Sequence, residues 1–276
     1  MPARRVVVTG LGQITPHGRD VAAGFEALLA GRSAVRRHAV GEAAHSTTLA
    51  TAVCADFDAG AELGRPRAIT MDRVSQLSVL ATRAAGADAG LPGVGAAKSS
   101  ALTDAERERA CVMWGIGAGA IQTLERGYRE LFVKGRPRIS PLSVVLGMNN
   151  AAADATEVGY VNAHGTATTE GDPVEADALR RLFGGHAPQV AVSATKSMHG
   201  HLMGAAGALE ALITVLAVHS GNIPPTAHLR QIDPACAGLD PVLGSGRHAV
   251  DLALALCNSF AFGGSNTVLA FRRHAA

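Results

Sequence analysis

The chain has 276 residues and a formal net charge of +2, with 25 basic and 23 acidic side chains. Hydrophobic residues make up 47% and charged residues 17%, which excludes a disordered chain and predicts a protein with a buried core. The charges form no basic stripe with interleaved aromatic residues, so we do not expect nucleic acid as a partner.

The cysteines and the apolar runs indicate a reduced, membrane-free environment. The first residues lack the apolar stretch of a signal peptide. The longest apolar run, over 202–218, is interrupted by Glu210 and several glycines, so we expect a buried helix there and a cytoplasmic protein. Four cysteines stand far apart with no C-x-x-C pair, which favours free thiols: Cys54, Cys111, Cys236 and Cys257.

The first half is predicted to alternate strands and helices. A strand over 6–8 runs into a tight turn at 9–12. Apolar spacing predicts helices over 21–31 and 72–90, followed by a strand at 111–114 and a helix over 121–132.

The second half repeats this alternation and predicts α/β layers. We expect, in chain order, a strand over 158–161, a helix over 173–183, a strand over 190–193, a helix over 204–219, and a pair of strands over 250–257 and 267–272 that flank a glycine turn at 258–266.

Two familiar motifs are incomplete. Gly10-Leu-Gly12 resembles the start of a dinucleotide-binding turn, but Thr15 stands where the third glycine belongs and no acid closes the pattern. Ser193 and Lys196 have the S-x-x-K spacing of serine acyl enzymes, yet Ser193 is expected at the end of a strand and the other motifs of those enzymes do not follow. We therefore expect neither a nicotinamide site nor a serine nucleophile.

Histidines follow two of the predicted strands. His164 precedes Gly165 after the first strand, and His199 and His201 follow Lys196 after the second. No thiolate or carboxylate completes a familiar zinc-ligand spacing, so we expect no metal site. Loops after parallel strands are where α/β proteins place their chemistry, and neutral imidazoles there can stabilise an oxyanion.

Four segments resemble the β-ketoacyl-acyl-carrier-protein synthases of the elongating type, often called synthase II. The resemblance covers nearly the whole chain and implies a thiolase-like layered α/β/α fold. The segments are Val7-Val-Thr-Gly-Leu-Gly12, Val161-Asn-Ala-His-Gly-Thr-Ala-Thr168, Thr195-Lys-Ser-Met-His-Gly-His-Leu-Met-Gly-Ala-Ala-Gly207 and Asn258-Ser-Phe-Ala-Phe-Gly-Gly264.

The resemblance implies a decarboxylative Claisen condensation in fatty acid or polyketide biosynthesis. An acyl group on a cysteine is attacked by the carbanion that forms when malonyl-acyl carrier protein loses CO2. His164 and His201 match the histidine pair that binds the malonyl thioester oxygen, and Lys196 matches a supporting lysine with Glu210 as its ionic partner. His199 stands where the family often has threonine.

The resemblance also implies how substrates are bound. They are carried on the phosphopantetheine of acyl carrier protein, so no separate cofactor is expected. Thr166 and Thr168 match hydroxyls that line the phosphopantetheine tunnel. Phe260 and Phe262 are expected to contact substrate, with Phe262 as the gating side chain, and Asn258 is expected to support the site.

The sequence departs from the family after the segment over 141–152. There the family continues into a long region that holds the nucleophilic cysteine and much of the dimer interface, whereas here Ala153-Asp154 leads directly toward the first histidine loop. We therefore expect an internally truncated fold, with an N-terminal part at 1–153 and a C-terminal part at 154–276, and no nucleophile.

Three interpretations of this departure remain open at the level of the sequence. The chain could retain only weak malonyl decarboxylation, without completing the condensation by itself. It could be a non-catalytic partner, similar to a chain-length factor, that forms a heterodimer with a complete ketosynthase; a homodimer is the other assembly considered. It could also be a complete enzyme whose sequence is faulty near Ala153-Asp154.

Overall fold

The computed structural model describes residues 7–40, 47–54, 58–68, 73–91, 155–261 and 265–274. The chain divides into two compact units, one of Met1–Gly24, Ala34–Ile116 and His274–Ala276 and the other of Phe25–Ser33 and Gly117–Arg273. The strand predicted at 111–114, the helix predicted over 121–132 and the predicted boundary at 153–154 all lie outside the described residues.

Helices dominate the described part of the first unit. The helix predicted over 72–90 is α4, Arg73–Asp88, and the helix predicted over 21–31 is α1, Val21–Leu29, which crosses from the first unit into the second. An antiparallel hairpin and two short helices were not predicted from the sequence: β1 (Arg36–Val40), β2 (Thr47–Thr51), α2 (Ala59–Leu63) and α3 (Arg65–Ala68).

The predicted strand at 6–8 is wrong for the residues that the structure describes. Val7 and Val8 form no strand and are 56% and 52% exposed. A strand exists only through its hydrogen-bonded neighbour, and no described segment pairs with this backbone. Gly10 and Gly12 instead lie against α4, where an added Cβ would collide with the backbone oxygens of Ala85 and Ala81, so the glycines permit a close approach of backbone to helix.

The second unit is built on a five-stranded sheet in the order β6-β4-β3-β8-β9. The strands β6, β4, β3 and β8 are parallel, and β9 is antiparallel to β8. Their bounds are β3 Val158–Asn162, β4 Ala191–Ser193, β6 Asp240–Pro241, β8 Leu254–Ala261 and β9 Ser265–Arg272.

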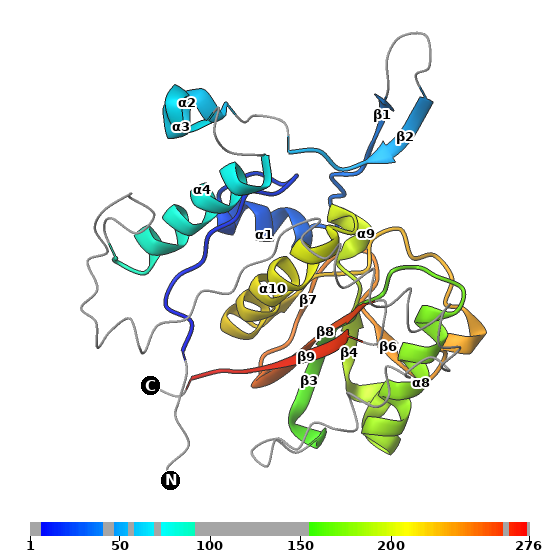
Figure 1. The fold of residues 1–276 in the computed structure, drawn as a ribbon. Helices are drawn as coiled ribbons and strands as arrows, with labels where there is room; N and C mark the ends of the chain where they lie inside the picture. Colours follow the sequence, from blue (N-terminus) through cyan, green and yellow to red (C-terminus); the bar gives the residue numbers. More distant parts are fainter. Residues whose placement is uncertain are drawn as a thin grey trace, which may run out of the picture. The chain divides into compact units, whose positions relative to one another are not determined.

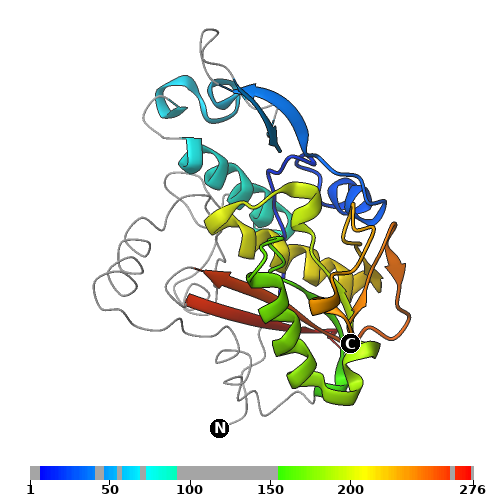
Figure 2. The same cartoon turned by 90° about the vertical axis from the view of Figure 1, so that its right-hand side faces the viewer.

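Helices cover both faces of this sheet, as Figure 1 and Figure 2 show. On one face lies α8 (Gly171–Phe183), whose Leu179 and Phe183 share a buried cluster with Val161, Leu254 and Leu256 of the strands. On the other face α10 (Ala206–Ser220) packs against β8 and β9. This arrangement confirms the α/β layers and the helices expected over 173–183 and 204–219.

The segment Met203–Ser220 is long and apolar enough to cross a membrane, judged by length and composition alone. Half of this segment is buried inside the protein, and it carries the fully buried Glu210. Its packing against the sheet matches the expectation of a buried helix in this stretch.

The last strand pair differs from its prediction. β8 begins at Leu254, where pairing with Val158 of β3 begins, while Val250 is 72% exposed. Most of the expected glycine turn is strand: Asn258 pairs with Val268, and pairing continues to Ala261. The polar residues stay in the strand because the ladder with β9 satisfies their backbone groups.

The remaining elements of the second unit are short. α9 (Lys196–His199) follows β4, and β5 (Asn222–Ile223) pairs with β7 (Arg247–His248). Four short 3-10 helices complete the described chain: Ala155–Glu157, Gly184–Gln189, Met203–Ala205 and Pro234–Cys236.

Candidate active site

The site lies at the carboxyl ends of the parallel strands β3 and β4, beside β8, which continues past them to Ala261. Asn162, the last residue of β3, is level with Ser193 of β4 and Cys257 of β8. His164 therefore leaves the sheet beside the turn that leads from β4 to Lys196. Parallel strands place their carboxyl ends at one edge, which is why segments far apart in the sequence converge here.

His164 and His201 face each other at this edge. Their ring centroids are 5.6 Å apart and the rings are nearly perpendicular, at 86°. Phe260 lies on another side of His164, with ring centroids 5.5 Å apart. The structure thus brings together three residues that were singled out in the sequence.

Both imidazoles of this pair are neutral at pH 7. Burial, reinforced by the nearby Lys196 ammonium and by His201, lowers the pKa of His164 to about 3. Burial and Lys196 also lower the pKa of His201. A neutral imidazole can donate one hydrogen bond from one nitrogen and accept at the other.

The tautomer of His201 follows from its neighbour. The backbone N–H of Met203 donates to Nδ1 of His201 at 3.2 Å, so Nδ1 accepts and the ring proton is assigned to Nε2. Met203 adopts a left-handed backbone conformation, with φ of 52°. His201 therefore presents an N–H donor on the side away from its own loop.

Lys196 and Glu210 form an ion pair beneath the histidines. The Lys196 ammonium bonds to Oε1 of Glu210, and the two side chains are 4% and 0% exposed. Burial raises the pKa of Glu210 to about 7, because desolvation of the carboxylate outweighs the attraction of Lys196. This is the pair that the resemblance implied.

Glu175 of α8 is a site residue that the sequence analysis missed. Its carboxylate accepts the backbone N–H groups of His164 at 2.9 Å and Gly165 at 3.0 Å. It also accepts Nδ2 of Asn258 at 2.9 Å, so Asn258 supports the histidine loop through Glu175. Burial raises the pKa of Glu175. The available signal was an acid on the apolar face of a predicted helix, because such residues are rarely buried without partners.

The predicted phosphopantetheine hydroxyls lie in the loop that follows His164. Thr168 is exposed, and its Oγ1 accepts the backbone N–H of Gly171 at the start of α8. Thr166 is half-buried, with its hydroxyl 3.5 Å from that of Thr168. Phe262, the predicted gate, lies outside the described residues.

Two family descriptions together match most of the chain. "Beta-ketoacyl synthase, N-terminal domain" matches residues 3–169, and "Beta-ketoacyl synthase, C-terminal domain" matches residues 144–230. The chain belongs to the beta-ketoacyl synthase family. Its histidine pair and Lys196 lie in the motifs by which the sequence resembled these enzymes, and Glu210 follows the second of the histidine motifs by three residues.

Individual relatives agree with this family. Nodulation protein E of Rhizobium sp. (strain N33) is 46% identical over 124 residues, which are 45% of this chain and 30% of that protein. A 3-oxoacyl-[acyl-carrier-protein] synthase 2 of Vibrio harveyi is 38% identical over 217 residues, covering 67% of this chain and 52% of the relative. The chain thus spans between about a third and a half of the length of these relatives.

Solved structures show the same fold. A beta-ketoacyl synthase from Burkholderia phymatum STM815 matches with a TM-score of 0.72 and 24% identity, covering 99% of this chain and all of that one. The thiolase-like α/β fold expected from the sequence is therefore confirmed.

Two of the three described cysteines of this ketosynthase chain have a raised thiol pKa, which makes them poorly suited to nucleophilic attack. Cys257 is buried in β8, and burial together with Glu210 raises the pKa of its thiol to about 12. Burial also raises the pKa of Cys236. Cys54 is half-buried with its thiol 3.8 Å from the Ile14 oxygen, and Cys111 lies outside the described residues. A thiolate is the reactive form, so a raised pKa makes a cysteine inert.

The surroundings of Ser193 and the grouping of possible metal ligands bear on the two other kinds of site considered from the sequence. Ser193 is buried at the end of β4, and its Oγ lies 2.8 Å from the hydroxyl of Tyr160. The S-x-x-K spacing is therefore not the helical arrangement that serine acyl enzymes use. Among the described residues, no three His, Cys, Asp or Glu side chains are grouped so that they could hold a metal ion.

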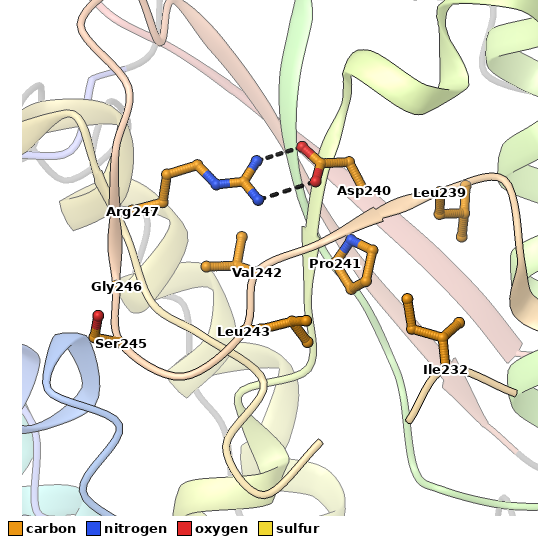
Figure 3. A pocket seen from close by; sticks show the side chains of 9 residues that line it. All are labelled: Ile232, Leu239, Asp240, Pro241, Val242, Leu243, Ser245, Gly246 and Arg247. Atoms are coloured by element: carbon orange, nitrogen blue, oxygen red, sulfur yellow. Dashed lines mark hydrogen bonds and ion pairs between the residues drawn. The ribbon is translucent and has the colours of Figure 1, made fainter. Parts of the chain in front are cut away.

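A separate open cleft of about 610 Å³ lies at the β6 end of the second unit (Figure 3). The side chains of Asp240 and Arg247 form an ion pair across it, with Nη2 of Arg247 2.9 Å from Oδ1 of Asp240. The other lining residues are Ile232, Leu239, Pro241, Val242, Leu243, Ser245 and Gly246. None of the predicted site residues of the ketosynthase lines this cleft.

Changing Glu175 to alanine should destabilise the protein and loosen the His164 loop. The change leaves the half-buried N–H groups of His164 and Gly165 without their acceptor, and an unsatisfied buried group costs about 1–3 kcal/mol. Urea unfolding should therefore show a loss of about 2–4 kcal/mol. Asp177→Ala on the exposed side of the same helix is the matched control. Equal losses in the two variants would contradict this role of Glu175.

Proposed function

We propose that His164 and His201 act on the malonyl thioester of acyl carrier protein and promote its decarboxylation. The observation that carries the proposal is the pair of facing imidazoles, both neutral at pH 7, above the buried Lys196–Glu210 pair. Preorganised N–H donors are most valuable where negative charge develops during a reaction.

The chemistry needs no cofactor beyond the carrier's phosphopantetheine. The bond between the malonyl carboxyl carbon and the α-carbon breaks, CO2 leaves, and the electron pair moves toward the thioester oxygen as an enolate. In this proposal Nε2–H of His201 donates to that oxygen, with His164 as the second imidazole of the pair; the assigned His201 tautomer and the facing rings support it. Protonation of the α-carbon by water then gives an acetyl thioester.

We further propose that the chain does not complete the condensation by itself. Carbon–carbon bond formation needs an acyl group on a nucleophile, and the family's nucleophile-bearing region is not evident between 152 and 156. The high pKa of Cys257 argues against a substitute thiol. The retained histidine and lysine residues of the chemistry favour this interpretation over the non-catalytic partner.

The proposed partner is acyl carrier protein, in the cytoplasm. The relative from Vibrio harveyi carries this partner in its name. The assembly we propose is a homodimer or a heterodimer with a complete ketosynthase. Size-exclusion chromatography with and without a complete ketosynthase distinguishes these assemblies from a monomer.

One mass-spectrometric experiment tests the proposed function. The protein is incubated with malonyl-acyl carrier protein and, separately, with a long-chain acyl-acyl carrier protein, and the intact masses of both partners are followed. We expect acetyl-acyl carrier protein to form faster than in buffer, and no acyl adduct on the ketosynthase chain. Acetyl formation at the rate in buffer would refute the decarboxylation, and a stable adduct on any cysteine would refute the loss of acylation.

A further inference from the structure

A third imidazole, His199, is buried two residues before His201. It is the last residue of α9, it is 2% exposed, and none of the chemistry proposed above uses it. Its Nδ1 lies 2.7 Å from the backbone oxygen of Gly200, and its Nε2 lies 3.2 Å from the hydroxyl of Thr195. Both ring nitrogens are therefore engaged by neighbours in the turn that leads to His201.

The Gly200 contact fixes both the ring proton and the turn. A carbonyl oxygen can only accept, so Nδ1 of His199 carries a proton and donates it to Gly200. The N–H of Gly200 donates to the Lys196 oxygen at 2.8 Å, which closes α9 with a positive φ of 77° at the glycine. Because a peptide unit is planar, holding the Gly200 oxygen also fixes the backbone N–H of His201.

The Thr195 contact leads to the other histidine loop. The Thr195 hydroxyl lies 3.3 Å from Oδ1 of Asn162 and shares its one proton between that oxygen and Nε2 of His199, which both accept; Thr195 and Asn162 are both fully buried. Asn162 ends β3 two residues before His164, and its Nδ2 donates to the backbone oxygen of Glu210 at 3.1 Å. The His199 ring thus stands between the turn before His201 and the strand end before His164.

We propose that His199 is a positioning residue that holds the Gly200–His201 peptide in register with the end of β3, and so sets the approach of His201 to His164. This inference rests on the proposed role of His201. A ring that only filled space would be replaceable by an apolar side chain, whereas buried polar atoms with two directional partners specify one geometry. When the hydrogen bonds of His199 are removed, we expect the His201 ring to lose its fixed position relative to His164.

Ring-nitrogen NMR spectra of histidine-labelled protein test the proposal without relying on activity. In the unchanged chain, His201 should show a protonated Nε2 and an unprotonated Nδ1, and a His201→Gln spectrum assigns these peaks. His199→Phe keeps the ring size but removes both contacts. His199→Asn can keep the donor to Gly200, while His199→Gln places its amide nearer Thr195. His219→Phe, at the exposed end of α10, is the matched control.

We expect His199→Phe to change the His201 ring-nitrogen shifts toward those of an exchanging mixture of tautomers, and His199→Asn to restore them. In the malonyl decarboxylation assay, kcat should fall about tenfold in His199→Phe, with KM within about twofold, as expected when a reacting group is misplaced. A folded His199→Phe protein with His201 shifts equal to those of His219→Phe would overturn the proposal.

The experiment remains decisive in two further cases. If His199→Phe does not fold, the comparison of His199→Asn with His199→Gln decides, because only the asparagine should preserve the His201 shifts; equal shifts in the two would overturn the proposal. If the unchanged chain shows no decarboxylation, the proposed function fails while the ring-nitrogen spectra still decide whether His199 positions His201.

Discussion

Replacing His164 or His201 with alanine should lower the rate of malonyl decarboxylation by about 100- to 1,000-fold, the loss expected when one oxyanion-stabilising donor is removed. The two rings face each other at 5.6 Å, so each variant removes one of two groups beside the same thioester oxygen. Because the groups act as a unit, the double variant should be little slower than the slower single variant.

The measurement is the formation of acetyl-acyl carrier protein at saturating malonyl-acyl carrier protein. His219→Ala is the matched control, because His219 is exposed at the end of α10 and lies outside the strand-end motifs. A His164 or His201 variant that keeps the full rate would show that the corresponding ring is not part of the chemistry.

The pH dependence of this rate gives a second check. Both rings have a lowered pKa, that of His164 being about 3, so both are neutral from pH 7 upward. The rate should therefore be constant above about pH 8, where neither ring titrates and Glu210, whose pKa is about 7, is already ionised. A rate that rises as the pH falls through 7, and does so equally in Glu210→Gln, would mean that an imidazolium is the active form.

The sequence predicted the residues of this site better than it predicted the residues that hold them in place. His164 and Lys196 could be placed because each follows a short apolar run bounded by glycines, and parallel strands bring such ends together. Glu175 was missed because its role is to hold backbone N–H groups of a loop eleven residues earlier in the chain. No pattern of side chains in the sequence predicts which carboxylate accepts hydrogen bonds from the backbone N–H groups of a distant loop.

The two errors in the predicted strand positions have a common cause. The valines at the start of the chain looked like a strand, and Asn258 looked like part of a turn, because both judgements used local composition. Strand limits are set by hydrogen-bonded neighbours: Val7 has none among the described segments, while Asn258 pairs with Val268. Helices such as α8 and α10 were predicted well because their pairing is internal to the segment.

Changing Lys196 to methionine should lower the free energy of unfolding by about 3–5 kcal/mol at pH 8, the usual cost of removing one partner of a buried ion pair. Methionine keeps much of the apolar stem but leaves the fully buried Glu210 carboxylate without its cation. Urea unfolding at equilibrium measures the loss. Arg272→Met, which removes the exposed ion pair with Glu157, is the control and should have a far smaller effect.

The loss should grow with pH. The pKa of Glu210 is about 7 in the folded protein and 4.5 as the reference for an unfolded chain, so the folded state binds the extra proton between these values. Stability from this group is therefore present below pH 4.5 and declines as the pH rises through 7. Without Lys196 the folded pKa should rise further, which extends the decline above pH 7 and makes the variant weakest in alkaline solution.

A double variant separates the buried charge from the lost packing. Lys196→Met combined with Glu210→Leu removes both charges and leaves two apolar side chains of similar volume, a replacement that is often neutral or stabilising. The double variant should recover most of the stability lost in Lys196→Met, and its stability should no longer fall between pH 5.5 and 8. If the single variant were equally weakened at both pH values and the second change restored nothing, the loss would come from packing around Lys196, and the ion pair would serve chemistry or positioning instead of charge compensation.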